Sequence, residues 1–492
     1  MLALDGSTLE GGGQLVRVAL SLSAICEVPV HIYNIRAGRG PHSFQKRAHG
    51  SRGNQGGRAS RGTSHYGGTK QKPGGGLKES HLAALTWLAR ECSAEIEGAE
   101  TGSQELIFKP ARRRKDGHLT SKRSETAGRN AGEDTDTDTE VIELKNPGSV
   151  WLIWQAIFPY IVFSMLQRRP SDRSETSAFR IRLKGGTNVP KSPSSEYMQQ
   201  VLLPLCERIG LPKVEIQVLR RGWTTGAAEI GEVEIAVFLP QQSGQNDERK
   251  KAEVDPVIRK RKIRAREDGF DEGEGFALAP FEITSPGPTT ITSISMTILA
   301  GSLEMHSLVQ TQLLESLRTM PVFSSPSLPI ELHPSSADSG DERRLYILLV
   351  AHTSAGYRLG RDYLSPGRKV TNETERQRTV DEAVGHVVRG FTRECRRGSC
   401  VDEFAEDQFV IFQALADGAS SIDVGKSGKG SNMAGGEDTG SLHTRTVRWV
   451  CREMLGTVFD GQGRCEGREM RREEGGFDDV EGGQSIESCG RP

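Results

Sequence analysis

The chain has 492 residues and a formal net charge of −1, because 64 lysines and arginines balance 65 aspartates and glutamates. This balance excludes a strongly basic or acidic protein whose overall field alone would select its partners. Hydrophobic residues make up only 35% of the chain and 57 residues are glycine. This composition excludes one compact core built from the whole length and predicts long surface inserts.

The cysteines and the N-terminus indicate the compartment. The eight cysteines show no C-x-x-C spacing, so we expect ordinary reduced thiols rather than a metal site or a disulfide framework. Asp5 and Glu10 interrupt the N-terminal segment, which does not fit a charged and then apolar secretory signal. We therefore expect an intracellular, soluble protein.

The first predicted unit is a strand, a glycine turn and a helix over residues 2–25. Residues 11–13 are consecutive glycines, which allow a tight turn and a close approach of the backbone to a ligand. In the helix, apolar residues recur on one side, while Gln14, Arg17 and Ser21 share the opposite side. The helix N-terminus suits an anion such as phosphate, and Arg17 adds a permanent cation. The alternative is a plain turn with a solvated arginine, because the motif is neither a P-loop nor the dinucleotide fingerprint.

The next segment is a strand that ends in two arginines and a basic insert. The strand is predicted at residues 30–35, followed by Arg36 and Arg39. Residues 40–72 are rich in glycine, serine and basic residues and contain no Asp or Glu, so we expect disorder there. This insert is either a basic arm that follows RNA phosphates, a tolerated insertion, or an error in the gene model.

An apolar run from residue 149 to 166 follows a predicted helix over 74–92 and a strand pair over 93–110. The run is long enough to be considered as a membrane span. Gln155 and Pro159 interrupt it, and no second span exists. We therefore prefer a buried core helix.

The strand–turn–helix–strand order returns after residue 178. We predict a strand near residues 180–183, a helix over 195–209 and an alternating strand over 214–219. The recurrence of strand, glycine-containing turn, helix and strand at a spacing of roughly one hundred residues indicates an internal structural repeat. The insert over 241–275 contains the basic run 259–266. That run is either a nuclear-targeting or RNA-contact segment or a solvated loop.

Residues 283–340 are predicted to hold a strand, a helix around 308–320 and another strand. We expect residues 346–351 to return to the main sheet as a strand. A further helix is predicted over 379–391.

The last part of the chain places a histidine at a helix start. A helix around residues 401–415 carries Asp407 and Gln408, and another helix starts near residue 441 with His443 at or just before its N-terminus. The positive end of a helix dipole disfavours imidazolium, which favours a neutral, nucleophilic ring. Taken alone, a histidine at this position is typical of a cap or packing residue.

The ordered motifs resemble the RNA 3'-terminal phosphate cyclase family, in its cyclase branch and its eukaryotic type with long inserts. The likeness runs from residue 2 to about residue 466, and several motifs in one order are more specific than any one of them. The motifs are residues 4–6, residues 10–14, Arg17, residues 35–39, residues 183–193, residues 399–408 and residues 442–444.

The resemblance implies an α/β (α+β) fold in which repeated βαβαββ-type units form a large domain that carries a small inserted α/β domain. The implied main domain covers residues 1–282 and 341–466, and the small domain covers 283–340. The expected disordered segments are the inserts 40–72, 111–138, 241–275 and 425–440 and a tail over 467–492.

The resemblance also implies an ATP-dependent cyclase. His443 matches the histidine that attacks the α-phosphorus of ATP, expels pyrophosphate and carries AMP. The AMP then passes to an RNA 3'-phosphate, and the neighbouring 2'-hydroxyl closes a 2',3'-cyclic phosphate. Arg17, Arg36 and Arg39 are the implied catalytic cations, with Mg²⁺ or Mn²⁺ on the triphosphate.

Further residues are implied around the nucleotide. The implied nucleotide-binding residues are Glu10, Gln14, Asp407, Gln408 and His81, and Glu10 is also the implied metal ligand. The expected partners are ATP and RNA with a 3'-phosphate end, without a membrane. The expected location is the nucleus, in the nucleoplasm or nucleolus, and also the cytoplasm.

Two departures from the family pattern keep another function open. Ser80 stands where the family has glutamine before His81, and residues 224–231 hold fewer glycines. The alternative is a catalytically inactive, cyclase-like factor in ribosomal RNA processing and ribosome assembly. The presence of His443, Arg17 and the pair Asp407 and Gln408 favours the enzyme. A general RNA-binding scaffold would rest on the basic inserts alone.

Overall fold

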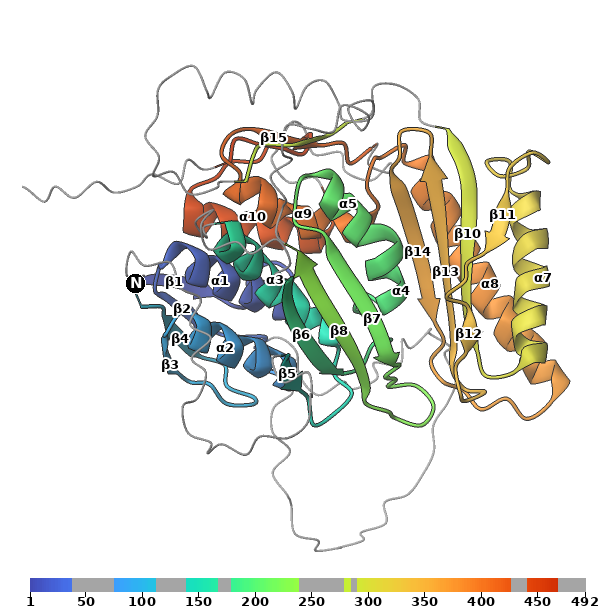
Figure 1. Cartoon of the computed structure of the whole chain (residues 1–492), viewed down its shortest axis with the longest axis horizontal. Coiled ribbons are helices and arrows are strands. Elements are labelled where there is room, and N and C mark those ends of the chain that lie inside the picture. The colour runs from blue at the N-terminus through green and yellow to red at the C-terminus, as the bar shows by residue number, and fades with distance from the viewer. Residues whose placement is uncertain are drawn as a thin grey trace, which may run out of the picture.

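The computed structural model of the protein is shown in Figure 1. It describes residues 1–37, 75–111, 139–166, 178–238, 278–284, 290–425 and 440–467. Apart from residues 111, 425, 440 and 467, the four expected inserts and the expected tail lie outside the described residues. Arg39 and the basic run 259–266 also lie outside them.

The first repeat has the order βαβαββ. Its elements are β1 (Leu2–Asp5), α1 (Gly13–Cys26), β2 (Val30–Tyr33), α2 (Glu79–Glu91), β3 (Glu95–Glu97) and β4 (Leu106–Lys109). The strand order in its sheet is β1-β2-β4-β3, with β1 and β2 parallel and the other pairs antiparallel. The helix α1 forms the crossover that two parallel strands require.

The second repeat follows the same order. Its elements are β5 (Glu140–Glu143), α3 (Val150–Leu166), β6 (Ala178–Gly185), the helical segment α4 (Ser195–Tyr197), η2 (Met198–Leu202) and α5 (Leu203–Arg208), then β7 (Val214–Arg220) and β8 (Gly231–Phe238). Its strand order, β5-β6-β8-β7, matches the first sheet position by position. The predicted internal repeat is therefore confirmed, but it starts at β5 rather than near residue 178: β6, the helical segment after it and β7 correspond to β2, α2 and β3 of the first repeat.

A third, smaller unit closes the fold. Its elements are β9 (Glu282–Ile283), α9 (Glu403–Leu415), β15 (Ser420–Ile422), α10 (Leu442–Leu455) and β16 (Arg464–Cys465). In its sheet β9 and β15 are parallel, and β15 and β16 are antiparallel. This is the pairing of β1, β2 and β4 in the first repeat, so the third unit follows the same plan with one strand fewer.

A separate layer is inserted between β9 and α9. Its elements are β10 (Ile291–Ala300), α7 (Leu303–Thr319), β11 (Ile330–Leu332), β12 (Ala337–Asp338), β13 (Leu345–Thr353), β14 (Arg358–Leu364) and α8 (Glu373–Arg396). The strand order is β11-β10-β13-β14, and β12 also pairs with β10. One face of this sheet packs with α7 and α8 into a second hydrophobic core.

The expectation that residues 346–351 return to the main sheet is wrong. These residues belong to β13, which pairs with β10 and β14 in the inserted sheet. Nearly all of β13 is buried, because its other face packs on the main core. The domain boundaries at 282 and 340 stay predictions, although this pairing joins residues from both sides of 340.

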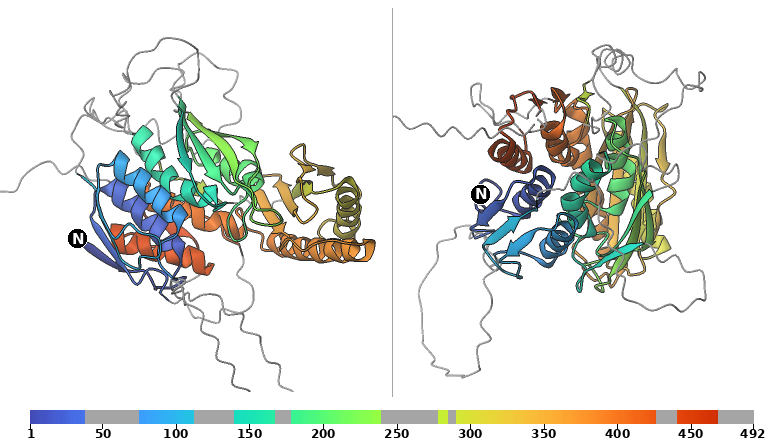
Figure 2. Two further views of the ribbon diagram at one scale, coloured as in Figure 1. Left: turned by 90° about the horizontal axis from the view of Figure 1, so that it is seen from below. Right: turned by 60° about the vertical axis from the view of Figure 1, so that its left-hand side comes forward.

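The apolar run of the second repeat forms a core helix, as preferred from the sequence. Almost every residue of α3 is buried, and α3 packs on α1, α2 and α9. Among the described residues, no helix combines the length and the apolarity that a bilayer crossing requires. Figure 2 shows the helices of the three repeats gathered between the sheets.

Candidate active site

The site begins at the glycine turn before α1. Gly11 has φ of +55°, a left-handed conformation that glycine adopts without strain. A side chain at Gly12 would collide with the carboxylate of Glu10, and one at Gly13 would collide with the ring of His81. The turn therefore brings Glu10 and His81 against the N-terminus of α1.

His443 is the second residue of α10, after the N-cap Ser441. Its Nδ1 lies 2.5 Å from Oε1 of Gln14 on α1. The Gln14 Nε2 donates to Oδ2 of Asp407 on α9 at 2.7 Å. Because an ionised carboxylate only accepts hydrogen bonds, the Gln14 oxygen is left for the ring, and Nδ1 carries the hydrogen. In a neutral ring the lone pair is then on Nε2.

The chain of amides continues from Asp407 to α3. Gln408 Nε2 donates to Oδ1 of Asp407 at 2.5 Å, and Gln155 Nε2 donates to Oε1 of Gln408 at 2.8 Å. Burial raises the pKa of Asp407, whereas the donors from Gln14 and Gln408 lower it, as do His443 and Arg17. One carboxylate thus orients two amides, and through one of them it orients the histidine.

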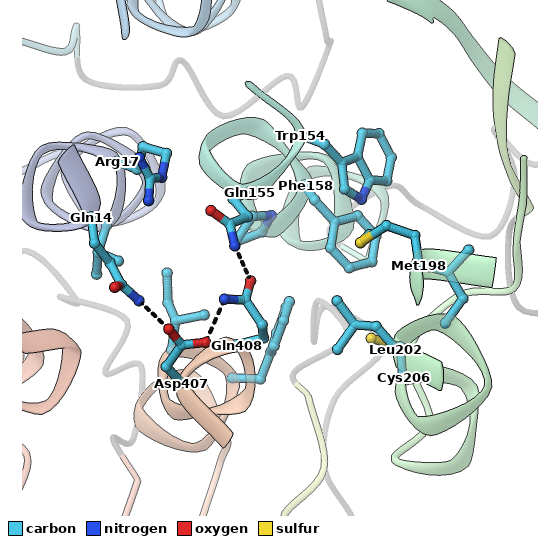
Figure 3. A pocket seen from close by; sticks show the side chains of 15 residues that line it. Gln14, Arg17, Trp154, Gln155, Phe158, Met198, Leu202, Cys206, Asp407 and Gln408 are labelled. Atoms are coloured by element: carbon cyan, nitrogen blue, oxygen red, sulfur yellow. Dashed lines mark hydrogen bonds between the residues drawn. The ribbon is translucent and has the colours of Figure 1, made fainter. Parts of the chain in front are cut away.

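A pocket lies beside this chain, between α1, α3, the η2–α5 segment and α9 (Figure 3). Its polar wall contains Gln14, Arg17, Gln155, Asp407 and Gln408, and its apolar wall includes Trp154, Phe158, Met198, Leu202 and Cys206. The Trp154 and Phe158 rings are stacked with their centroids 4.8 Å apart. An apolar, aromatic wall with a few convergent polar groups is typical of a small-molecule site.

The charge of the site comes mainly from arginine. Burial lowers the pKa of Arg17 to about 10, and the carboxylates of Glu10 and Asp407 act in the opposite direction. This value is far above neutrality, so the guanidinium stays charged. Its Nε is buried and has no hydrogen-bond partner within the described residues, which leaves a donor for a ligand.

Arg36 and His81 complete the neighbourhood of Arg17. Arg36 is buried, and its Nη1 donates to the Gly76 carbonyl at 3.1 Å. Burial, together with the nearby cations Arg17 and Arg36, puts the pKa of His81 well below its ordinary value. The neutral His81 ring accepts a hydrogen bond from the Lys78 N–H at Nδ1, 3.0 Å away. His81 therefore contributes a neutral group beside two cations.

Glu10 is tied to the histidine helix. Its N–H donates to Oγ1 of Thr446 on α10 at 3.2 Å, so its carboxylate lies at the junction of α1 and α10. Within the described part of the chain, no group of three or more His, Cys, Asp or Glu side chains is placed to hold a metal ion. A single carboxylate suits Mg²⁺ when most of the other ligands are phosphate oxygens and water, and Glu10 fits that requirement.

The structure gathers the expected residues but adds one that sequence reasoning did not assign to the site. The described candidates all lie on or around α1 and come from the first and third repeats: Glu10, Gln14, Arg17, Arg36, His81, Asp407, Gln408 and His443. Gln155 was noted only as an interruption of an apolar run. A lone amide in a buried helix was the available signal, because such a group needs a hydrogen-bond partner.

Comparison with known proteins identifies the family. A family model described as RNA 3'-terminal phosphate cyclase matches residues 8–44 and 68–460. The chain belongs to the RNA 3'-terminal phosphate cyclase family. The match contains every described site residue above.

The chain is similar to several proteins that are each named RNA 3'-terminal phosphate cyclase. The chain is 26% identical to one from Drosophila melanogaster over 467 residues, which cover 94% of this chain and 92% of the relative. It is 27% identical to one from Desulfurococcus amylolyticus over 426 residues, covering 86% and 87%. It is 32% identical to one from Ignicoccus hospitalis over 231 residues, covering 47% and 46%.

The departure from the cyclase pattern at residues 224–231 lies at the inserted sheet. Arg344 donates to the carbonyl oxygens of Thr225 and Ala227, and its guanidinium lies 5.5 Å from the Trp223 ring centroid. None of these residues lines the pocket beside Gln14. The missing glycines therefore affect the contact with the inserted layer rather than the pocket wall.

Proposed function

We propose that the protein is an ATP-dependent RNA 3'-terminal phosphate cyclase that works through a covalent histidine–AMP intermediate. The hydrogen-bonded chain His443–Gln14–Asp407 carries the proposal, because it holds one ring nitrogen and leaves the other with its lone pair. The arginines beside it supply the positive charge that a triphosphate and an RNA phosphate need.

In the first step Nε2 of His443 attacks the α-phosphorus of ATP. The N–P bond forms, the bond to the bridging oxygen breaks, and pyrophosphate leaves with that oxygen. The ring becomes positively charged, and Gln14 Oε1 stabilises it by accepting from Nδ1–H, much as a carboxylate holds a catalytic histidine in other enzymes. Asp407 supports this indirectly by fixing the orientation of Gln14.

The pocket suggests how ATP lies. The base and ribose would pack on the apolar wall around Trp154 and Phe158, with the phosphates toward Arg17, Arg36 and the N-terminus of α1. Glu10 would hold Mg²⁺ or Mn²⁺ at the phosphate end. When bound, that ion supplies charge neutralisation for the triphosphate.

In the second stage the AMP moves from His443 to the 3'-phosphate of an RNA. The N–P bond breaks, and a phosphate oxygen of the RNA forms the new bond to AMP. The adjacent 2'-hydroxyl then attacks the RNA phosphorus, loses its proton and expels AMP, which leaves a 2',3'-cyclic phosphate. We place this activity in the nucleus, which localisation of the tagged full chain would test.

Labelling with ATP tests the proposal. The protein is incubated with α-labelled ATP and Mg²⁺ or Mn²⁺, and acid-labile label on the protein is measured. We expect label on the natural protein and none on His443→Ala. His31→Ala is a matched control. His31 lies on β2 and bonds the exposed Glu105 just before β4, so we expect this variant to keep the label.

The same assay separates the enzyme from the alternative of an inactive factor in ribosome assembly. An absence of label on the natural protein with either metal would contradict the cyclase proposal. Label that persists on His443→Ala would move the nucleophile to another residue.

A further inference from the structure

A row of arginines follows the exposed face of the second half of α8. Arg389, Arg393 and Arg396 are all exposed, and their spacing of four and three residues places them on one face of the helix. The opposite face packs into the second core through Val384, Val387 and Phe391, among others. We call Arg389, Arg393 and Arg396 the arginine row.

The members of the arginine row have no partner in the described part of the chain. Within the described residues, no hydrogen bond or ion pair joins any member of the row to another side chain. Nearby arginines are paired: Arg368 with Glu382, and Arg397 with Glu394 and Glu406. Glu394, the acidic residue within this half of α8, is buried and already bonded to Arg397. The row is therefore a patch of uncompensated positive charge.

The arginine row ends close to the start of α10, the helix that carries His443. Arg397 directly follows α8 and lies 3.5 Å from Glu406 on α9. Gly440 lies against the same carboxylate, since a Cβ atom there would be 2.8 Å from Glu406 Oε1. His443 is three residues after Gly440. Figure 2 shows α8 (orange) running from the outer part of the inserted layer toward the repeats that carry α9 and α10.

We propose that the arginine row binds the phosphate backbone of single-stranded RNA just upstream of its 3' end and thereby guides that end to His443. Arginine binds phosphate with a fork of donors. From Arg389 to Arg396 the helix rises about 10 Å at 1.5 Å per residue, which matches about three nucleotides at 3.4 Å each along a stacked strand. This inference rests on the proposed function, because it takes RNA as the substrate.

The salt dependence of RNA binding tests the inference. The variant replaces all three members of the row, as Arg389→Gln, Arg393→Gln and Arg396→Gln. The probe is an RNA of about ten nucleotides with a 3'-phosphate; each lost phosphate contact should lower the slope of log K against log salt by about 0.7. For the row variant we expect the magnitude of this slope to fall by about two. Raising the salt from 50 to 200 mM should then weaken RNA binding about twentyfold less in the variant than in the natural protein.

A matched control variant and a short RNA distinguish a specific contact of the row with RNA from a general effect of removing positive charge. The control removes the same charge at the start of α8 and just before it, as Lys369→Gln, Arg376→Gln and Arg378→Gln, and we expect it to keep most of the slope. If the row binds phosphates upstream of the 3' end, a ribodinucleotide with a 3'-phosphate is too short to contact it, so we expect the row variant to change KM for the longer RNA only. Self-labelling with ATP should be equal in all three proteins.

Three results would contradict the inference or the proposed function. An unchanged salt slope in the row variant would overturn the inference, including the case in which the row instead binds a protein. An equal loss for the dinucleotide and the longer RNA would also overturn it. Failure of self-labelling in the natural protein would contradict the proposed function instead, while the salt slope would still report on the row.

Discussion

At the scale of single residues, Gln155 connects the pocket to the nucleophile. Its Nε2 is committed to Gln408, and its Oε1 is buried without a partner within the described residues. The direction of every amide between α3 and His443 is set by the carboxylate of Asp407, which can only accept. Gln155 is therefore a positioning residue: it acts on the histidine through other side chains.

We predict that Gln155→Leu slows self-adenylation about tenfold, because the half-buried oxygen of Gln408 loses its donor, a loss of about 1–3 kcal/mol. The control is Gln199→Leu, whose amide donates to the Ile216 carbonyl at 2.9 Å, outside the pocket. The rate of label incorporation at saturating ATP is the measurement. Equal slowing in both variants would point to general destabilisation and contradict the assignment.

At the scale of elements, buried acidic groups join α8 to α9. Glu394 near the end of α8 is almost fully buried and accepts from Arg397 at 2.8 Å. Burial, and next the nearby Asp402, raise the pKa of Glu394 to about 7, against the opposing effect of Arg397 and Arg361. Asp402 is the N-cap of α9 and also accepts from Tyr197 Oη at 2.6 Å. The junction between the inserted layer and the third repeat is therefore sensitive to protonation.

The sign of this dependence follows from linkage. Between its ordinary pKa of 4.5 and about 7, folded Glu394 keeps a proton that the unfolded chain has released. Its contribution to stability is therefore present at low pH and falls as the pH rises through this window. We predict that Glu394→Gln becomes more stable relative to the natural protein by up to about 3 kcal/mol across it.

Urea unfolding at several pH values measures this difference. The control is Glu382→Gln, since Glu382 forms an exposed ion pair with Arg368, and we expect a nearly constant difference for it. A constant difference for Glu394→Gln from acidic to neutral pH would contradict the prediction.

At the scale of the whole molecule, the site exists only when three repeats are assembled. Gln14 and Arg17 come from the first repeat, Gln155 from the second, and Asp407 and His443 from the third. Each repeat presents a helix to the centre, and these helices pack on one another. A ligand that contacts all of them should stabilise the assembled state.

We predict that ATP raises the midpoint of thermal unfolding. At a concentration of one hundred times Kd, ligand binding adds about 2.7 kcal/mol to the stability. His443→Ala should retain the shift, because the variant removes the bond-forming nitrogen rather than the pocket wall. Calorimetry with ATP and Mg²⁺ is the measurement, and the absence of a shift in both proteins would contradict ATP binding in this pocket.

Several features were predictable from local patterns. The strands and helices of the repeats, and the place of His443 in the first turn of α10, follow from residue periodicity and turn chemistry. The buried nature of α3 also followed, since a single apolar run with a proline and a glutamine fits a core helix better than a membrane span. The family resemblance rested on motifs that stay together along the chain.

Other features needed the tertiary structure. Strand β13 is buried on both faces, so its sequence has no alternation to indicate which sheet it joins. Gln14 and Asp407 are separated by 393 positions, and His443 and Gln14 by 429, so no local pattern indicates that they bond.

The sequence by itself determined the elements, the repeated order and the residue types that the chemistry needs, because these depend on neighbours a few positions apart. Only the tertiary structure decided which amide faces the histidine, which strand joins which sheet and which arginines remain unpaired. Hydrogen bonds and ion pairs act over a few ångströms in space, whatever the separation of their partners along the chain.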